Sequence, residues 1–300
     1  MPGPIVSASY RTDIPAFYAE WFRVRLAAGA CRVRNPWTGA VAEVSLAAGA
    51  VDGFVFWTRN LRPFAPLMPV IRGRAPFVVQ MTVTGYPRPL ERSVIGAADG
   101  VAQLRALAQA WGGRAAVWRY DPVVISDLTP AAWHRANFAR LADQLAGWVD
   151  EVVLSFLHPY RKSRRNLDRA AAAHGFGWSD PPAEAKRALL AELARLAAER
   201  GLRTSLCAQP ELLIEGVEPA RCIDAERLSA LAGRPISARE RGNRPGCACA
   251  QARDIGAYDT CPHGCVYCYA VQSRSLARRA HAAHDPAQPE LGRQPDRDGA

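Results

Sequence analysis

Long apolar runs, lysine and internal repeats are scarce or absent in this sequence. No apolar stretch of the 300-residue chain is long enough to span a bilayer, so we expect no membrane association. The first residues, from Met1 to Val6, lack a charged region followed by an apolar one, so we expect no signal peptide and a cytoplasmic protein. Because 49% of the residues are hydrophobic, the chain can bury a substantial core in one large domain or two small ones.

Lysine is so rare that nearly all of the positive charge comes from arginine. Of the 38 lysine and arginine residues only Lys162 and Lys186 are lysines, and the formal net charge is +10. Such a charge is typical of proteins that bind polyanions such as nucleic acids. The chain is also rich in Ala, Gly and Pro, a composition that a GC-rich genome produces without selection for binding. The charge therefore leaves a small-molecule substrate and a nucleic-acid substrate both open.

Cysteine is nearly missing before residue 207, where only Cys31 occurs. The other cysteines all lie between residues 207 and 268. In a reducing compartment, thiols bind metals or carry redox chemistry more often than they form disulfides. The distribution therefore predicts a cysteine-rich metal-binding region (207–268), with Cys31 outside it, and not a disulfide framework.

The segment C-P-H-G-C-V-Y-C-Y-A places Cys261, Cys265 and Cys268 in one short loop, with Tyr267 before the third cysteine. Structural zinc sites usually have four protein ligands, and ferredoxin runs supply four cysteines. Three thiolates at this spacing can hold three irons of a [4Fe-4S] cluster and leave the fourth iron open. The pattern is similar to that of radical SAM enzymes, in which S-adenosylmethionine (SAM) binds the open iron. Zinc is the alternative metal for these three thiolates.

A second group of thiols precedes this loop. Cys207 follows a candidate strand, Cys222 stands in R-C-I-D, and Cys247 and Cys249 form a C-x-C pair. Four thiols beside a three-thiol loop predict a second metal site with a complete set of protein ligands, either another [4Fe-4S] cluster or zinc. The alternative is that some of them are buried as small apolar residues.

Strands and helices alternate along the chain, which favours parallel pairing with right-handed crossovers. About eight such units fit a (β/α)8-type or partial parallel barrel, and a doubly wound open sheet is the alternative. We expect one α/β domain over residues 1–272 and a disordered tail over 273–300. The candidate strands are Ile5–Ser9, Cys31–Arg34, Gly53–Thr58, Phe77–Thr84, Ala115–Tyr120, Glu151–Phe156, Arg203–Cys207 and Asp254–Ala257.

Polar residues cluster where these strands end. In parallel barrels, the carboxyl ends of the strands carry the functional groups. Arginine binds carboxylates or phosphates bidentately, and aspartate holds hydroxyls or amines. Helix capping is the alternative role for Asp13. His263 is expected to be exposed, and the basic run 161–165 fits phosphate contacts or a solvated surface.

Four segments of the sequence resemble one bacterial family: I-V-S-A-S-Y-R-T-D-I-P from residue 5, F-W-T-R-N from 56, W-R-Y-D-P from 118 and D-I-G-A-Y-D-T-C from 254. The family is known as domain of unknown function 1848, and the resemblance covers roughly residues 4–272. Its members are regarded as radical-SAM-like because of the C-terminal cysteine motif. The cysteine loop is also similar to that of the spore photoproduct lyase group, which repairs DNA.

Radical SAM enzymes usually carry their cysteines after the first barrel strand, whereas here the cysteines come last. A circular permutation of the barrel would reconcile the two orders, with 254–257 in the place of the first strand and 5–9 in that of the second. No glycine-rich SAM-binding motif stands out elsewhere in the sequence.

The resemblance implies reductive cleavage of SAM to a 5′-deoxyadenosyl radical, with an electron donor such as flavodoxin or ferredoxin. We predict Arg119 and Asp121 at the substrate, and Arg11, Asp13 and Tyr267 at the cofactor. A DNA lesion lyase, a non-catalytic iron–sulfur or zinc protein, and a nucleic-acid-binding module are the alternatives.

Overall fold

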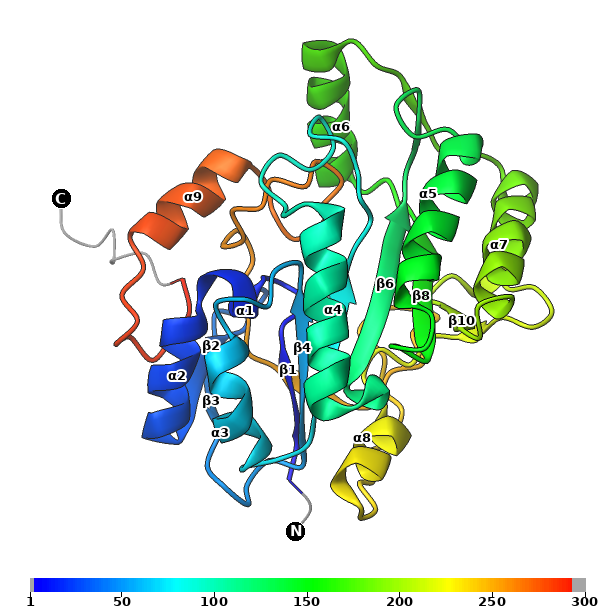
Figure 1. The fold of residues 1–300 in the computed structure, drawn as a ribbon. Helices are drawn as coiled ribbons and strands as arrows, with labels where there is room; N and C mark the ends of the chain where they lie inside the picture. Colours follow the sequence, from blue (N-terminus) through cyan, green and yellow to red (C-terminus); the bar gives the residue numbers. More distant parts are fainter. Residues whose placement is uncertain (1–2, 293–300) are drawn as a thin grey trace, which may run out of the picture.

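The computed structural model describes residues 3–292 and is built on one large parallel sheet of eight strands (Figure 1). All of its neighbouring strands pair in parallel. This confirms the α/β class and the parallel pairing predicted from the alternating pattern. The strands of the sheet are β1 (Ile5–Ala8), β4 (Gly53–Thr58), β5 (Phe77–Thr82), β6 (Ala116–Val123), β8 (Glu151–Phe156), β10 (Arg203–Leu206), β11 (Glu218–Pro219) and β12 (Ala252–Asp254).

The strand order decides between the two predicted architectures. It runs β11-β10-β8-β6-β5-β4-β1-β12, so from β1 to β11 the strands follow the chain without reversing direction across the sheet. A doubly wound sheet would reverse at a switch point, so that alternative is wrong. The result is a partial barrel with β11 and β12 at its two edges. The last strand, β12, pairs with the first, Ile5 opposite Ala252 and Ser7 opposite Asp254, as the permutation predicts.

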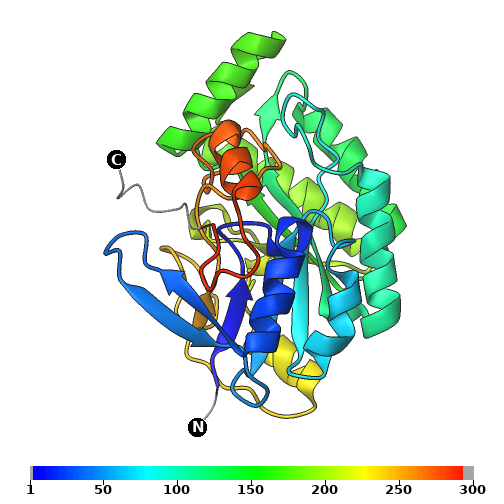
Figure 2. The same ribbon diagram turned by 90° about the vertical axis from the view of Figure 1, so that its left-hand side faces the viewer.

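Helices cover the outer face of the sheet (Figures 1 and 2). Alternate strand residues such as Phe56, Trp118 and Leu154 pack against them in the main core. α7 (Ala183–Ala198) begins after Pro182 and buries a leucine stripe. The helices are α1 (Ile14–Phe17), α2 (Ala19–Ala28), α3 (Met68–Arg72), α4 (Ala97–Trp111), α5 (Ala131–Leu145), α6 (Arg161–His174), α7 (Ala183–Ala198), α8 (Ala225–Ala232) and α9 (Arg274–Ala282), with short 3₁₀ turns η1 (Ala65–Leu67), η2 (Gly113–Ala115) and η3 (Pro210–Leu212).

The inner face of the sheet is filled at one end and polar at the other. Val55, Val78 and Val117 from three neighbouring strands pack against α8 and the segment that follows it. Gly53 lies so close to Leu228 of α8 that a Cβ would stand 2.8 Å from a leucine methyl. α8 therefore plugs the end of the half-barrel at which the strands begin. The polar groups face the other end.

The predicted barrel strand at 31–34 is wrong. β2 (Ala30–Arg34) pairs antiparallel with β3 (Val41–Ser45) in a separate hairpin, shown in blue in Figure 2. Only Cys31 of β2 is fully buried, whereas strands of a parallel sheet are covered on both faces. A second short ribbon pairs β7 (Ile125–Ser126) with β9 (Trp178–Ser179).

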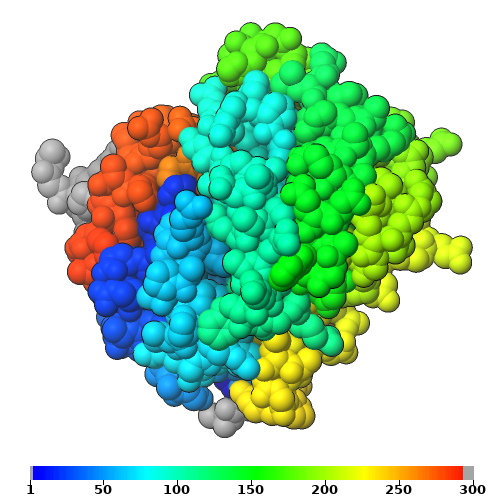
Figure 3. Space-filling view, viewed as in Figure 1, coloured from blue at the N-terminus to red at the C-terminus, as the bar shows by residue number. Residues whose placement is uncertain are grey.

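The expected disordered tail at 273–300 needs correction over the part that the structure describes. Residues 274–282 form α9, and the chain after it packs on the N-terminal elements (Figure 3). Trp21 Nε1 donates to the carbonyl of Gln288 at 2.9 Å, and Leu291 is buried in the main core. The sequence of this segment suggested a disordered tail because its apolar residues are few and widely spaced. Residues 293–300 lie outside the described residues.

No helix within residues 3–292 is both long and apolar enough to cross a membrane.

A buried carboxylate joins the last strand to the first. Asp254 accepts hydrogen bonds from the hydroxyls of Ser7 at 2.6 Å and Ser9 at 2.8 Å, and from the Tyr10 backbone N–H at 3.1 Å. Arg11 Nε donates to the same carboxylate at 2.8 Å, and both side chains are buried. Since its charge is matched and its oxygens are used, the carboxylate tolerates burial. Side chains as well as backbone pairing therefore hold β12 on β1.

We expect Asp254→Ala to lower the free energy of unfolding by about 3–5 kcal/mol, because the buried Arg11 guanidinium then has no carboxylate partner. Asp99→Ala is the matched control, since Asp99 and Arg62 lie 3.8 Å apart and are mostly exposed, and such pairs contribute about 0–1 kcal/mol. Urea denaturation of both variants measures the difference, and equal losses would contradict the role given to Asp254.

Candidate metal centre

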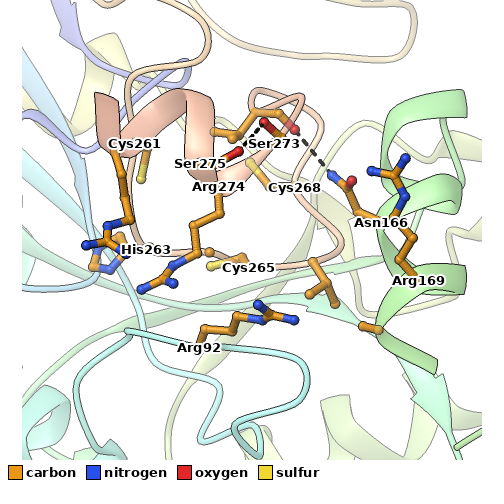
Figure 4. Close-up of a pocket in the computed structure, with 15 residues that line it drawn as sticks. Arg92, Asn166, Arg169, Cys261, His263, Cys265, Cys268, Ser273, Arg274 and Ser275 are labelled. Atoms are coloured by element: carbon orange, nitrogen blue, oxygen red, sulfur yellow. Dashed lines mark hydrogen bonds between the residues drawn. The ribbon is translucent and has the colours of Figure 1, made fainter. Parts of the chain in front are cut away.

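Residues 259–270, here called the cysteine loop, follow β12 and lie over the end of the half-barrel at which the strands finish. Cys261, Cys265 and Cys268 line one cavity of about 340 Å³, and each is partly exposed to it (Figure 4). Gly264 takes a positive φ of 76° in the middle of the loop, and a Cβ there would lie 2.5 Å from Arg274. The loop therefore turns three thiols toward one space, as the spacing predicts.

A buried network fastens the loop to the sheet. The Tyr267 hydroxyl accepts a hydrogen bond from Arg59 Nη2 at 2.6 Å and donates to Glu91. Arg59 also pairs with Glu91 at 2.7 Å, and Thr84 donates to that carboxylate at 2.6 Å. Burial opposes the charge of Arg59, but Glu91 outweighs it, with smaller contributions from Tyr267 and Cys265, so its pKa stays above the ordinary value. Tyr267 thus fixes the position of the loop.

His263 is buried, so the prediction that it is exposed is wrong. Its Nε2 lies 2.8 Å from Asp13 Oδ2, and only 3% of the residue is exposed. The same Asp13 oxygen accepts the Arg59 backbone N–H at 2.8 Å, and Oδ1 caps α1 through the N–H of Ala16. The capping alternative for Asp13 is therefore what the structure shows, together with a contact to the cysteine loop. The loop is too well packed for its histidine to reach solvent.

The charged residues that line the cavity are all basic. Arg92, Arg169 of α6, and Arg274 and Arg278 of α9 surround it, and none of the described lining residues is acidic. Figure 4 shows Arg92, Arg169 and Arg274 around the cysteines. Sequence reasoning missed this set, because it comes from three separate segments and α6 was not expected as a helix.

The residues fit an anionic metal cluster. Burial is the main cause that raises the pKa of each thiol, to about 12 for Cys265, and for Cys261 and Cys265 the neighbouring thiolates add to it. Metal binding needs thiolates, so crowded thiols of this kind are stabilised when a cation joins them. Two residues that line the cavity also carry a buried atom, His263 Nδ1 and Arg274 Nε, with no hydrogen-bond partner among the described residues. Buried polar groups are normally paired, so these two atoms have hydrogen-bonding capacity that the protein does not use.

The other four clustered cysteines, here called the thiol quartet, also come together, on the inner face of the sheet. The Sγ atoms of Cys207 and Cys222 are 3.6 Å apart. Cys249 Sγ accepts the backbone N–H of Ile223, the residue after Cys222, at 3.4 Å, and all four cysteines belong to one buried cluster. Cys31 lies elsewhere, buried in the main core.

Arg119 and Asp121 stand beside the thiol quartet. Arg119 Nη1 lies 3.0 Å from Cys222 Sγ, and Nη2 pairs with Asp121 at 2.5 Å. Ser155 donates to the other Asp121 oxygen, and Gln80 accepts from Arg119 at 3.2 Å. Burial opposes the ionisation of Asp121, but Arg119 and Ser155 outweigh it and hold the pKa of its carboxyl below the ordinary value. This is a polar, charge-matched wall inside the half-barrel.

The predicted site residues therefore fall into two neighbouring groups. Arg11, Asp13 and Tyr267 support the cysteine loop without lining its cavity, while Arg119 and Asp121 adjoin the quartet. In residues 3–292, no set of three or more His, Cys, Asp and Glu side chains is already placed around one point as a single-ion site requires. Closing such a site would need side-chain rotation.

A family model described as Domain of unknown function (DUF1848) matches residues 5–270. The chain belongs to this family. The match confirms the resemblance in the motifs at residues 5, 56, 118 and 254. It covers all eight strands of the sheet and both cysteine groups of this DUF1848 protein. No curated protein and no solved structure matched the chain in the same comparisons.

We expect Tyr267→Phe to lower the free energy of unfolding by about 1.5–3 kcal/mol, because the hydroxyl bonds to two charged groups in the interior. Tyr269→Phe is the control, since its hydroxyl donates to the Tyr10 carbonyl while 40% of the residue is exposed, and it should cost under about 1.5 kcal/mol. Urea denaturation provides both values. A Tyr267→Phe protein as stable as the parent would contradict the anchoring role.

Proposed function

We propose that this protein is an iron–sulfur enzyme of the radical SAM type. One observation carries the proposal: three thiols at x3 and x2 spacing face a single arginine-lined cavity at the open end of parallel strands. The loop follows β12, the strand that takes the first position once the permutation is allowed for. When bound, a [4Fe-4S] cluster with SAM on its open iron supplies the electron that cleaves SAM to a 5′-deoxyadenosyl radical.

The residues of the chain have distinct tasks under this proposal. Cys261, Cys265 and Cys268 are the cluster ligands. The four arginines of the cavity wall offset the negative charge of the cluster and of the SAM carboxylate, which arginine binds bidentately. His263 also lines the cavity, and its Nδ1 has no partner among the described residues. An external one-electron donor such as flavodoxin or ferredoxin would be required.

The supporting residues act by position. Asp254 holds Arg11 at 2.8 Å, and Asp13 holds His263 at 2.8 Å, so both predicted cofactor contacts are engaged with the protein. Arg119 and Asp121 line the inner face of the half-barrel, where a substrate would be shielded from water. We therefore assign substrate binding to Arg119 and Asp121, and loop positioning to Arg11, Asp13 and Tyr267.

The test is anaerobic reconstitution with iron and sulfide, followed by reduction with dithionite in the presence of SAM. We expect 5′-deoxyadenosine from the parent chain and only background from Cys265→Ser, because one cluster ligand is lost. Cys31→Ser is the control and should match the parent, since Cys31 lies in the main core away from the cavity. A stable cluster that never cleaves SAM would instead favour a non-catalytic metalloprotein.

A specific feature favours nucleic acid as the substrate, the alternative related to DNA lesion repair. α6 carries five basic residues and one acidic residue, and α9 carries three arginines and no acid. The two helices meet at the cavity, where Arg165 of α6 donates to the Gln272 carbonyl at 3.0 Å. Tyr160 and Tyr269, each 40% exposed, lie next to them with ring centroids 6.3 Å apart. Basic groups interleaved with exposed aromatics are typical of single-strand binding surfaces.

We expect a single-stranded oligonucleotide to bind at low salt and to be released steeply as salt rises. Arg161→Glu combined with Arg278→Glu, one exposed residue on each helix, should reduce the slope of log K against log salt by about 1.4, the value for two phosphate contacts. Arg105→Glu with Arg114→Glu, on α4 and η2, keeps the same net charge as control. Fluorescence anisotropy measures the slope. If both pairs weaken binding equally, or nothing binds at low salt, the nucleic-acid alternative fails.

A further inference from the structure

The thiol quartet draws its members from three segments that are distant in sequence. Cys207 follows β10, Cys222 follows β11, and Cys247 and Cys249 belong to the loop before β12. The Sγ atoms of Cys207 and Cys222 are 3.6 Å apart, and Cys249 Sγ accepts the backbone N–H of Ile223, the residue after Cys222. All four cysteines, Cys247 included, gather in one cluster on the inner face of the sheet, which is more than the packing of small apolar residues requires.

Two arginines point at the sulfurs. Arg119 Nη1 lies 3.0 Å from Cys222 Sγ, and Arg244 Nη2 lies 3.6 Å from Cys207 Sγ. Arg119 is only 4% exposed, so its charge is removed from water. Asp121 matches this charge at 2.5 Å, so Nη1 is left to donate to Gln80 and to the sulfur. Hydrogen bonds to the sulfurs are the usual second contact of metal–thiolate centres.

The loop that carries the C-x-C pair is long and has no regular secondary structure. Residues 233–251, between α8 and β12, contain no helix or strand, and a single bridge joins Glu240 to Ala250. Gly246 takes a positive φ of 74° just before Cys247, so that the chain turns toward Cys207. Long structureless loops inside a compact domain are usually functional, and a bound metal can supply the stability that such a loop lacks.

The spacing of the sulfurs defines the class of ligand. Zinc–thiolate bonds of about 2.3 Å place the sulfurs of a tetrahedral site about 3.8 Å apart, close to the 3.6 Å between Cys207 and Cys222. The four cysteines share one cluster but do not form a ready metal-binding group within residues 3–292, so binding would require their side chains to rearrange. Soft thiolate sets select zinc or iron–sulfur clusters.

We propose that the chain binds a second metal centre whose ligands are all thiolates, those of Cys207, Cys222, Cys247 and Cys249. The metal is zinc or the iron of a [4Fe-4S] cluster, and every ligand comes from the protein, so no position is left open. Arg119 contacts both Cys222 and Asp121. The proposed second centre therefore lies against Arg119 and Asp121, the two residues to which substrate binding is assigned. This centre does not depend on the three thiols of the cysteine loop.

The test uses the full chain with Cys261, Cys265 and Cys268 all changed to alanine. Because these three thiols are absent, the result does not depend on whether the proposed function is correct. After anaerobic incubation with zinc alone, or with iron and sulfide, elemental analysis should find about one zinc or about four irons per chain. The metal that binds at stoichiometry identifies the centre. Absence of both would overturn the proposal.

A further Cys247→Ser change in the same protein should remove that metal. Cys247 is partly exposed and lies outside any helix or strand, so the variant should fold. Cys31→Ser in the same background is the matched control and should keep the metal. Hydrogen exchange of residues 233–251 supplies a readout without activity: the metal should slow exchange there in the control and leave Cys247→Ser unchanged. Equal metal content in the two proteins would refute the ligand assignment.

Discussion

The Asp254 carboxylate joins β12, the last strand in the sequence, to β1, the first strand. The cysteine loop follows β12, so this junction holds the loop at the mouth of the half-barrel. Arg11, Ser7 and Ser9 all bond to the Asp254 carboxylate, so the first strand and its following turn are fixed by a residue almost 250 positions later. From this junction the chain has only a few residues before Cys261. The position of the three thiols is therefore set by an ion pair in the sheet, and then by the Tyr267 network above it.

The charged side chains are arranged differently around the two cysteine groups. Around the cysteine loop the arginines stand at the cavity wall, and the carboxylates Asp13 and Glu91 are turned away into the protein, where they hold His263, Arg59 and Tyr267. Around the thiol quartet, Arg119 is shared between a sulfur and a carboxylate. Both arrangements favour anionic centres. They differ in that the first leaves room for a ligand from outside, whereas the second is closed by protein groups.

Those parts of the fold and of the candidate site that depend on residues close together in the sequence could be predicted. Buried β-branched runs such as Phe77–Thr82 indicated the strands, and the x3 and x2 spacing brought three thiols to one cavity. The β2–β3 hairpin was missed because the run 31–34 has strand propensity whichever sheet it joins. α6 and α9 carry many charges and few large apolar residues, so they resemble exposed charged segments, although their small apolar residues do recur at helical spacing. The burial of His263 depends on Asp13, a partner 250 positions away, which no local pattern reports.

Because the cysteine loop follows the last strand in the sequence, its thiols are synthesised after the rest of the sheet. Synthesis runs from the N-terminus, and domains can fold as they emerge. Seven of the eight strands, with the helices between them, leave the ribosome before β12 and the loop that follows it. The three thiols of the loop thus appear after the other seven strands, and they meet a sheet in which those strands can already be paired. In a protein with the usual order the same thiols would wait, unprotected, while the rest of the barrel was still being synthesised.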